Sequence, residues 1–193
     1  MHQSFFKYLK KFSSEPLTKA EKKTITKAFS PLKLKKKQYF LHAGHHCKHF
    51  AFIVKGAMRQ YIVNNKGIEL IIRVGIENWW MGDRESFIFS KPSLYYIDAW
   101  EETEMLIISM EDSLQLMRIP AISAMMVQLD ERNSIANQKR IASLISLSAE
   151  KRYANFVASY PELVSRFPQH IIASYLGITK DTLSRVKLSH NRE

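Results

Sequence analysis

The chain has 193 residues, of which 46% are hydrophobic and 24% charged, and its formal net charge is +11. This balance excludes an intrinsically disordered chain and predicts a buried core. No apolar run has the length of a membrane span, and lysines interrupt the apolar N-terminus, so we expect neither a membrane segment nor a secretory signal. The single cysteine, Cys47, has no partner for an internal disulfide, which is typical of a cytoplasmic protein.

The positive charge is concentrated at the two ends of the chain. Residues 1–50 contain 12 Lys or Arg and 2 Asp or Glu, which gives +10, and residues 151–193 contain 7 and 3, which gives +4. The middle of the chain is mildly acidic. Residues 51–110 contain 6 Lys or Arg and 8 Asp or Glu, a net charge of −2, and residues 111–150 contain 4 and 5, a net charge of −1. Basic ends suit a polyanion such as DNA or RNA, although a solvated lysine-rich surface explains the same charge equally well.

The first forty residues are predicted to be largely helical. Residues 5–12 place aromatic residues and leucine at helical spacing, and Thr18 with Glu21 forms the T-x-x-E pattern of a capping box. Pro31 is expected to end the second helix, after which the residues alternate toward a strand.

Short β-branched and aromatic runs fill the region from about Gln38 to Ser109. Glycine turns separate them, and "NNKG" at 64–67 is a strong hairpin signal. Many short strands at this spacing predict a small antiparallel roll or sandwich, in which we expect Trp79 and Trp80 to pack.

A second helical region begins near Glu111. A short helix is expected first, and Pro120 starts a longer one that reaches about Leu147. Its predicted stripe consists of Ile122, Met125, Met126, Leu129, Asn133, Ala136 and Leu144. The stripe either packs against the roll or joins two chains, and the dimer is slightly favoured, with Asn133 setting the register.

The segment 168–188 is the most informative stretch of the chain. It consists of a helix, a turn at Gly177 that favours the left-handed conformation, and a second helix capped by Thr179. Leu183 and Val186 should face inward. This is the helix-turn-helix pattern, whose second helix can enter a major groove. The outward residues are Lys180, Asp181, Ser184 and Arg185.

These side chains match the donors and acceptors of DNA. Arg185 can pair with guanine, Lys180 with guanine or phosphate, and Asp181 with cytosine. Thr179 and Thr182, at the N-terminus of the second helix, can hold phosphate oxygens. An ordinary helical hairpin is the less favoured alternative.

The order of roll, long helix and C-terminal "IASYLGITKDTLSRV" resembles the Crp–Fnr family, the bacterial regulators related to the cyclic-AMP receptor protein and the fumarate–nitrate regulator. The resemblance implies DNA reading by Lys180, Asp181 and Arg185, and phosphate contacts by Gln169, Thr179 and Thr182. It also implies a homodimer joined through residues 121–147. The family's β-hairpin wing is expected to be absent, because only "YPELVSRF" separates the helices.

The family's nucleotide cassette is only half present. Gly82 and Asp83 match its glycine and acid, but Ser93, Leu94 and Tyr95 stand where arginine, a small hydroxyl residue and alanine are expected. The charge-assisted pair with the cyclic phosphate is therefore missing. Arg84 and Lys91 are the possible replacement cations. We expect cyclic AMP to bind weakly or not at all, with Gly82 kept for backbone freedom and Asp83 for local hydrogen bonds.

The histidine-rich turn "LHAGHHCKHF" suggests a metal site, because imidazole and thiolate ligands suit zinc. A cupin-like metalloenzyme using His45, His46 or His49 is the enzyme alternative. It needs a ligand from a later strand, and no histidine occurs between His49 and His170. Solvated histidines are therefore favoured over a metal site. We expect that the protein binds no metal and no cofactor and is not an enzyme.

The sequence predicts an α+β chain: an N-terminal antiparallel β-roll of the cyclic-nucleotide-binding, jelly-roll type, a long dimerisation helix and a C-terminal helix-turn-helix. The expected boundaries are 1–120, 121–147 and 148–193. The expected function is DNA-binding transcription regulation by a cytoplasmic homodimer with an effector that the sequence does not identify. A ligand-sensing module that does not read DNA is a further alternative.

Overall fold

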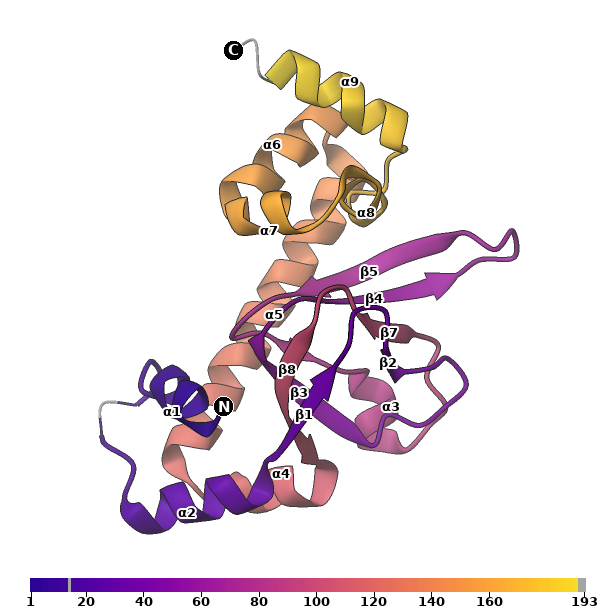
Figure 1. Cartoon of the computed structure of the whole chain (residues 1–193). Coiled ribbons are helices and arrows are strands. Elements are labelled where there is room, and N and C mark those ends of the chain that lie inside the picture. Colours follow the sequence, from indigo (N-terminus) through magenta and orange to yellow (C-terminus); the bar gives the residue numbers. More distant parts are fainter. Residues whose placement is uncertain (14, 191–193) are drawn as a thin grey trace. The chain divides into compact units, whose positions relative to one another are not determined.

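The computed structural model describes residues 1–13 and 15–190 (Figure 1). The chain divides into two compact units. Unit 1 comprises Met1–Ile62 and Val74–Glu131, and unit 2 comprises Val63–Arg73 and Arg132–Glu193, of which 191–193 lie outside the described residues. Unit 2 thus combines the tip of a β-hairpin with the second half of the long helix. The predicted domain boundaries remain a prediction.

An antiparallel roll forms most of unit 1, as the sequence predicted, although residues 69–73 of its fifth strand belong to unit 2. Its strands are β1 (Ser30–Leu34), β2 (Tyr39–Leu41), β3 (His49–Lys55), β4 (Met58–Val63), β5 (Glu69–Gly75), β6 (Trp80–Met81), β7 (Tyr96–Ala99) and β8 (Thr103–Ser109). One sheet has the order β1-β8-β3-β6 and the other β2-β7-β4-β5. The two sheets enclose an apolar interior that includes Ile53, Met81 and Met105.

Glycine shapes one of the roll's tightest turns. Gly56, between β3 and β4, has a φ of +99°, and a Cβ there would lie 2.5 Å from the Glu102 carbonyl oxygen. Any other residue would strain the backbone and collide with the chain.

Helices cover one side of the roll in unit 1. They are α1 (His2–Leu9), α2 (Lys19–Ala28), α4 (Met110–Leu116) and the first part of α5 (Pro120–Ser146). The predicted capping box is present, because the Thr18 side chain accepts from the Glu21 amide and the Glu21 carboxylate accepts from the Thr18 amide. Helix α2 ends at Ala28, three residues before Pro31, as is usual for a proline that follows a helix. Pro31 itself lies in β1, where its fixed φ is tolerated at a sheet edge.

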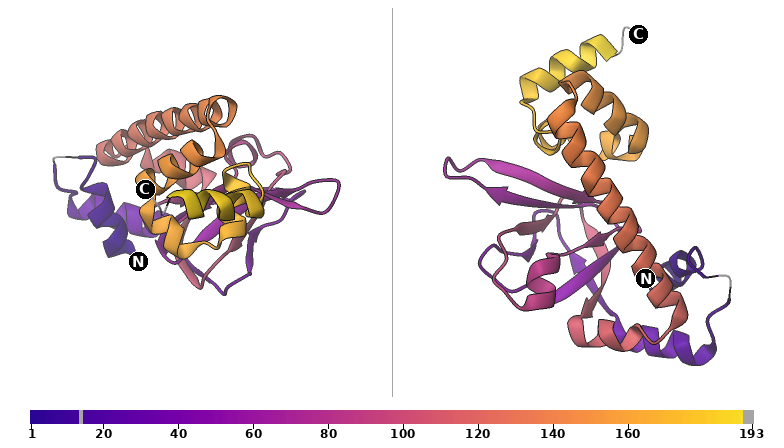
Figure 2. Two further views of the ribbon diagram at one scale, coloured as in Figure 1. Left: turned by 90° about the horizontal axis from the view of Figure 1, so that it is seen from above. Right: turned by 180° about the vertical axis from the view of Figure 1, so that it is seen from behind.

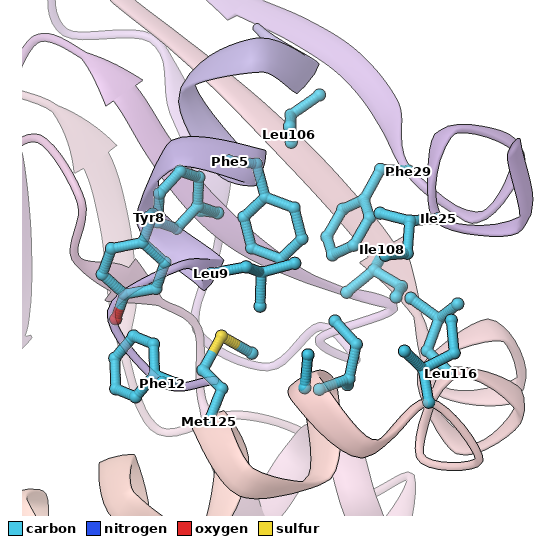
Figure 3. Packing of buried hydrophobic residues seen from close by; sticks show 14 residues of the cluster. Phe5, Tyr8, Leu9, Phe12, Ile25, Phe29, Leu106, Ile108, Leu116 and Met125 are labelled. Carbon is cyan, nitrogen blue, oxygen red and sulfur yellow. The ribbon is translucent and has the colours of Figure 1, made fainter. Parts of the chain in front are cut away.

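A second apolar core fixes these helices to the roll (Figure 3). Phe5 stands at its centre, with its ring 4.7 Å from that of Phe29 and 5.0 Å from that of Phe52. Trp80 packs edge-on against Phe5, as expected for a structural tryptophan. Full burial of each large apolar side chain stabilises the unit by about 1.5–3 kcal/mol.

The helices that follow α5 belong to unit 2. They are α6 (Ala149–Ser159), α7 (Pro161–Arg166), α8 (Gln169–Tyr175) and α9 (Lys180–His190). Figure 2 shows α5 as one uninterrupted helix. The segment expected to lack a β-wing forms α7. None of the described helices has both the length and the apolar character that a membrane crossing requires.

The predicted stripe of α5 has a different role from the one expected. Ile122 and Met125 are buried in the core around Phe5, and Met126 and Leu129 pack against it. Asn133 accepts a 3.4 Å hydrogen bond from Arg73 of the same chain, and its role in setting a dimer register stays a prediction.

Another side of α5 remains apolar and exposed. Val127, Ile141 and Ile145 are 57%, 58% and 81% exposed. At 100° per residue they fall within about 40° of one another around the helix axis. The helix therefore carries two apolar rows, one covered by the roll and one open to solvent.

Candidate nucleic-acid interface and effector pocket

The turn between α8 and α9 has the geometry of a Schellman motif. Gly177 has a φ of +66°, as predicted for a left-handed residue. The Ile178 amide donates to the Ala173 carbonyl over 3.0 Å, and the Gly177 amide donates to the Ser174 carbonyl over 3.1 Å. These bonds satisfy the last carbonyls of α8 and set the direction in which α9 leaves.

Helix α9 presents most of the predicted residues to solvent. Thr179 caps it by accepting from the Thr182 amide over 3.1 Å. Leu183 and Val186 are buried, as predicted, against the other helices of unit 2. Lys180, Asp181 and Arg185 are exposed, whereas Thr182 and Ser184 are half-buried. Three charged side chains therefore share the outward surface of the first two turns.

Hydrogen bonds connect the shorter polar side chains of this surface. The Ser184 hydroxyl lies 3.2 Å from Gln169 Oε1, so Gln169 is tied to α9. Thr179 and Thr182 share a 2.9 Å bond between their hydroxyls, and Arg185 donates weakly to Thr182 Oγ1 over 3.5 Å. The structure thus brings the seven residues proposed from the sequence onto α9 and the start of α8.

An arginine that the sequence did not single out binds the hairpin tip to α8 within unit 2. Arg140, on α5, donates to the carbonyl of Ile72 over 2.6 Å and to that of Tyr175 over 2.9 Å. Its guanidinium lies 4.1 Å from the centre of the Tyr175 ring. Burial raises the pKa of Tyr175, and the Arg140 charge opposes part of that rise.

Ser174 makes the second connection. Its hydroxyl accepts from the Ile71 amide over 2.9 Å and lies 3.4 Å from the Glu69 carbonyl. The edge of β5 is thereby paired with the C-terminal turn of α8. We call Arg140 and Ser174 the hairpin clamp, because both bind backbone groups of β5.

The first half of the nucleotide cassette has an internal structural role. The Asp83 carboxylate caps the short helix α3 (Arg84–Phe89) and accepts from the amides of Glu85 and Ser86, which confirms its predicted local bonding. The predicted reason for Gly82 is wrong, because its φ is not positive. A Cβ there would lie 2.5 Å from the Phe50 ring, so glycine is needed for close packing.

The second half of the cassette is closed by its own hydrogen bonds. Ser93 is only 2% exposed, and its hydroxyl accepts from the Tyr95 amide over 3.0 Å. Its backbone pairs with the histidine turn, through Ser93 N–H to the His45 carbonyl and Gly44 N–H to the Ser93 carbonyl. Leu94 points outward and is 74% exposed.

A cavity of about 220 Å³ lies beside this segment, with Leu94 and Tyr95 in its lining. Asp83, Glu85 and Lys91 provide its charged groups, and Lys91 already pairs with Glu85 over 3.5 Å. The volume is below the usual range for a small-molecule site, and the lining carries a net negative charge.

The other cations near the cassette are also engaged. Arg84 forms a two-bonded ion pair with Asp130 of α5, which raises the pKa of the Arg84 guanidinium. Deeper in the roll, Arg59 pairs with Asp98 through two bonds of 2.9 Å, and both residues are buried. The charges of Arg84 and Arg59 are therefore already compensated by a carboxylate.

The histidine turn lines a separate cavity of about 520 Å³, to which His42, His45, His46 and His49 all contribute. Among residues 1–13 and 15–190, no three His, Cys, Asp or Glu side chains are grouped as a metal ion requires. Burial raises the pKa of the Cys47 thiol to about 11, so this thiol stays protonated at neutral pH. The expectation of a protein without metal stays a prediction.

Comparisons with known proteins show which domain family the roll is similar to. Residues 31–119 match the family model of the cyclic nucleotide-binding domain. No curated protein matches the chain by sequence.

Solved structures match most of the chain. FixK2 from Bradyrhizobium japonicum is 14% identical with a TM-score of 0.72, covering 85% of each chain. The c-di-GMP-responsive global regulator CLP of Xanthomonas campestris is 15% identical with a TM-score of 0.69, covering 90% of this chain and 93% of CLP. A Eubacterium rectale protein assigned to the Crp/Fnr family of transcriptional regulators is 19% identical with a TM-score of 0.67, covering 91% and 84%. The predicted resemblance to the Crp–Fnr family is confirmed at the level of the fold.

Proposed function

We propose that this protein is a homodimeric transcription regulator of the Crp–Fnr type, in which α8 and α9 form the DNA-reading helix-turn-helix. The observation that carries the proposal is the surface of α9, where Lys180, Asp181 and Arg185 are exposed on a helix anchored by buried Leu183 and Val186. The N-terminus of such a helix can meet base edges in a major groove. The similarity to regulators of this fold supports the same function.

Each side chain has a distinct role in this proposal. Arg185 pairs with a guanine, Lys180 with a guanine or a phosphate, and Asp181 with a cytosine amino group. Thr179, Thr182 and Gln169 contact phosphates and fix the register, and Ser184 holds Gln169 in place. The roll is a sensor-type domain that does not use cyclic AMP, and the protein is neither an enzyme nor dependent on a cofactor.

Selection of bound fragments from genomic DNA of the source organism tests the proposal and yields the operator. We expect a near-palindromic sequence, because two identical half-sites follow from a two-fold dimer. Recovery of no enriched sequence, with the protein folded and dimeric, would contradict DNA reading and favour a sensing module.

Arg185→Ala then tests the assigned contact. We expect a loss of about 1–3 kcal/mol in binding to the selected site, with relaxed base choice at one position of each half-site. Lys151→Ala removes one exposed positive charge from the same unit and serves as the control. An equal loss on every sequence would show that Arg185 touches only the backbone.

A further inference from the structure

Helix α2 carries lysines along one side and its apolar contact on the other. Ile25 is fully buried in the core around Phe5, and Glu21 and Ala28 beside it are half-buried. The exposed lysines of the helix are Lys19, Lys22, Lys23 and Lys27, which we call the lysine row. At 100° per residue, the row is centred about 135° from Ile25 on the helical wheel. Most of the positive charge therefore faces solvent rather than the core, and all four lysines are exposed.

None of the four lysines takes part in an ion pair within the part of the chain that the structure describes. The one acidic residue of α2, Glu21, is held by Thr18 in the capping box. Other lysines reinforce the local field, since Lys7, Lys10 and Lys11 are exposed at and after the end of α1. The row is thus an uncompensated positive surface in a segment whose net charge is +10.

We propose that the lysine row is a second DNA-contacting surface that binds phosphates without reading sequence. The inference goes beyond the proposed function but rests on it, because it assumes that this protein works on DNA. Lysine is a point charge that suits phosphate, and residues 1–50 contain no arginine that could form a two-bonded contact with guanine.

The dimensions of the row fit a duplex. Lys19 and Lys27 are separated by about 12 Å along the helix axis, at 1.5 Å per residue. A duplex carries one charge per 1.7 Å, so the same length presents about seven phosphate charges to four ammonium groups. A membrane surface is the weaker fit, because interfacial helices insert a large apolar side, and that of α2 is occupied by the protein core.

The test compares two variants of the full chain, each of net charge +7 instead of +11. The row variant replaces the four lysines of the row by glutamine. The control variant makes the same change at exposed lysines elsewhere, namely Lys48, Lys55, Lys66 and Lys139. Binding to a labelled duplex without a selected site is measured across a series of KCl concentrations, and circular dichroism checks that both variants are folded.

Each phosphate contact contributes about 0.9 to the slope of log K against log salt, so the row variant should have a slope shallower by up to about 3.6. We also expect at least about a tenfold loss of affinity at 0.1 M salt, with the ratio of specific to non-specific binding preserved. The control variant should keep a slope close to that of the wild type.

Three outcomes would overturn the inference. In the first, the row variant and the wild type have the same slope of log K against log salt while both bind the selected operator. The row is then a solvated surface, and the proposed function still holds. If the wild type binds no DNA at all, both proposals fail. If the row is needed for binding to phosphatidylserine vesicles but not to DNA, its partner is a membrane.

Discussion

Single residues decide what the cassette can bind. Asp83 and Glu85 place two carboxylates beside the small cavity, while Lys91 is paired with Glu85 and Arg84 with Asp130. The position where the family has its phosphate-binding arginine holds the buried Ser93, whose hydroxyl is already bonded. A cyclic phosphate would lose its hydration at this site and gain no cation in return.

We therefore predict that calorimetry with cyclic AMP and cyclic GMP detects no micromolar binding. Loss of a charge-assisted pair removes about 2–5 kcal/mol, which corresponds to about 30-fold to several-thousand-fold in affinity. Asp83→Asn is the matched control, because asparagine keeps the cap of α3 while removing the acid that the family uses for ribose. Micromolar binding that disappears in this variant would show a working nucleotide site.

At the scale of elements, the hairpin clamp holds the tip of the β4–β5 hairpin and α8 together within unit 2. Arg140→Met keeps the aliphatic stem of the side chain but removes the donors to Ile72 and Tyr175. We expect a local loss of about 2–3 kcal/mol, since hydrogen bonds from a charged donor contribute about 1.5–3 kcal/mol each and the site is partly solvated. The wild-type clamp should therefore suppress opening of this contact.

Hydrogen exchange measures that opening directly. In Arg140→Met, amides of residues 69–73 and 169–178 should exchange about 30- to 140-fold faster, by the conversion of about 1.4 kcal/mol per factor of ten. Lys139→Met changes the exposed neighbour of Arg140 on the same helix and should leave these rates unaltered. Unchanged exchange in Arg140→Met would mean that the clamp contributes nothing to the docking of α8.

The elements that could be predicted from the sequence are those with a local signature. Thr18 with Glu21 marked the start of α2, and Gly177 with Thr179 marked the turn into α9. Helix α3 was not predicted, because its six residues are too few to show a periodic pattern.

Long-range contacts to backbone groups had no such signature. Arg140 binds carbonyls that lie 35 to 69 residues away in the sequence, and a carbonyl is present in every residue. The side of α5 that packs against the roll could not be predicted for a related reason. Two apolar rows fit the same helical period, and only the packed structure shows that Ile122 and Met125 are used by the roll.

At the scale of the whole molecule, the open row of α5 is the surface that a second copy should cover. Ile145 is 81% exposed, and with Val127 and Ile141 it forms an apolar row on a helix of 27 residues. Spacings of 14 and 4 residues match a coiled-coil seam, in which two helices bury such a row against each other. This supports the proposed homodimer through 121–147, on a different side of the helix from the one first predicted.

Replacement of Ile141 and Ile145 by aspartate should convert the dimer to monomers in sedimentation velocity. Four buried carboxylates at a two-fold seam would lose hydration and repel one another. Leu94→Asp introduces a charge at an equally exposed leucine of the cassette and should leave the dimer intact. A monomeric wild type, or a double variant that remains dimeric, would contradict this interface.

The contact between Gly82 and the Phe50 ring has a consequence for how protein families are surveyed. The glycine is required by an aromatic neighbour and the acid after it by a helix cap, so the structure explains both residues without a ligand. The glycine and the acid alone therefore do not indicate a nucleotide site, whereas an arginine at the position of Ser93 would. A survey of second-messenger receptors should require that arginine as well as the glycine and the acid.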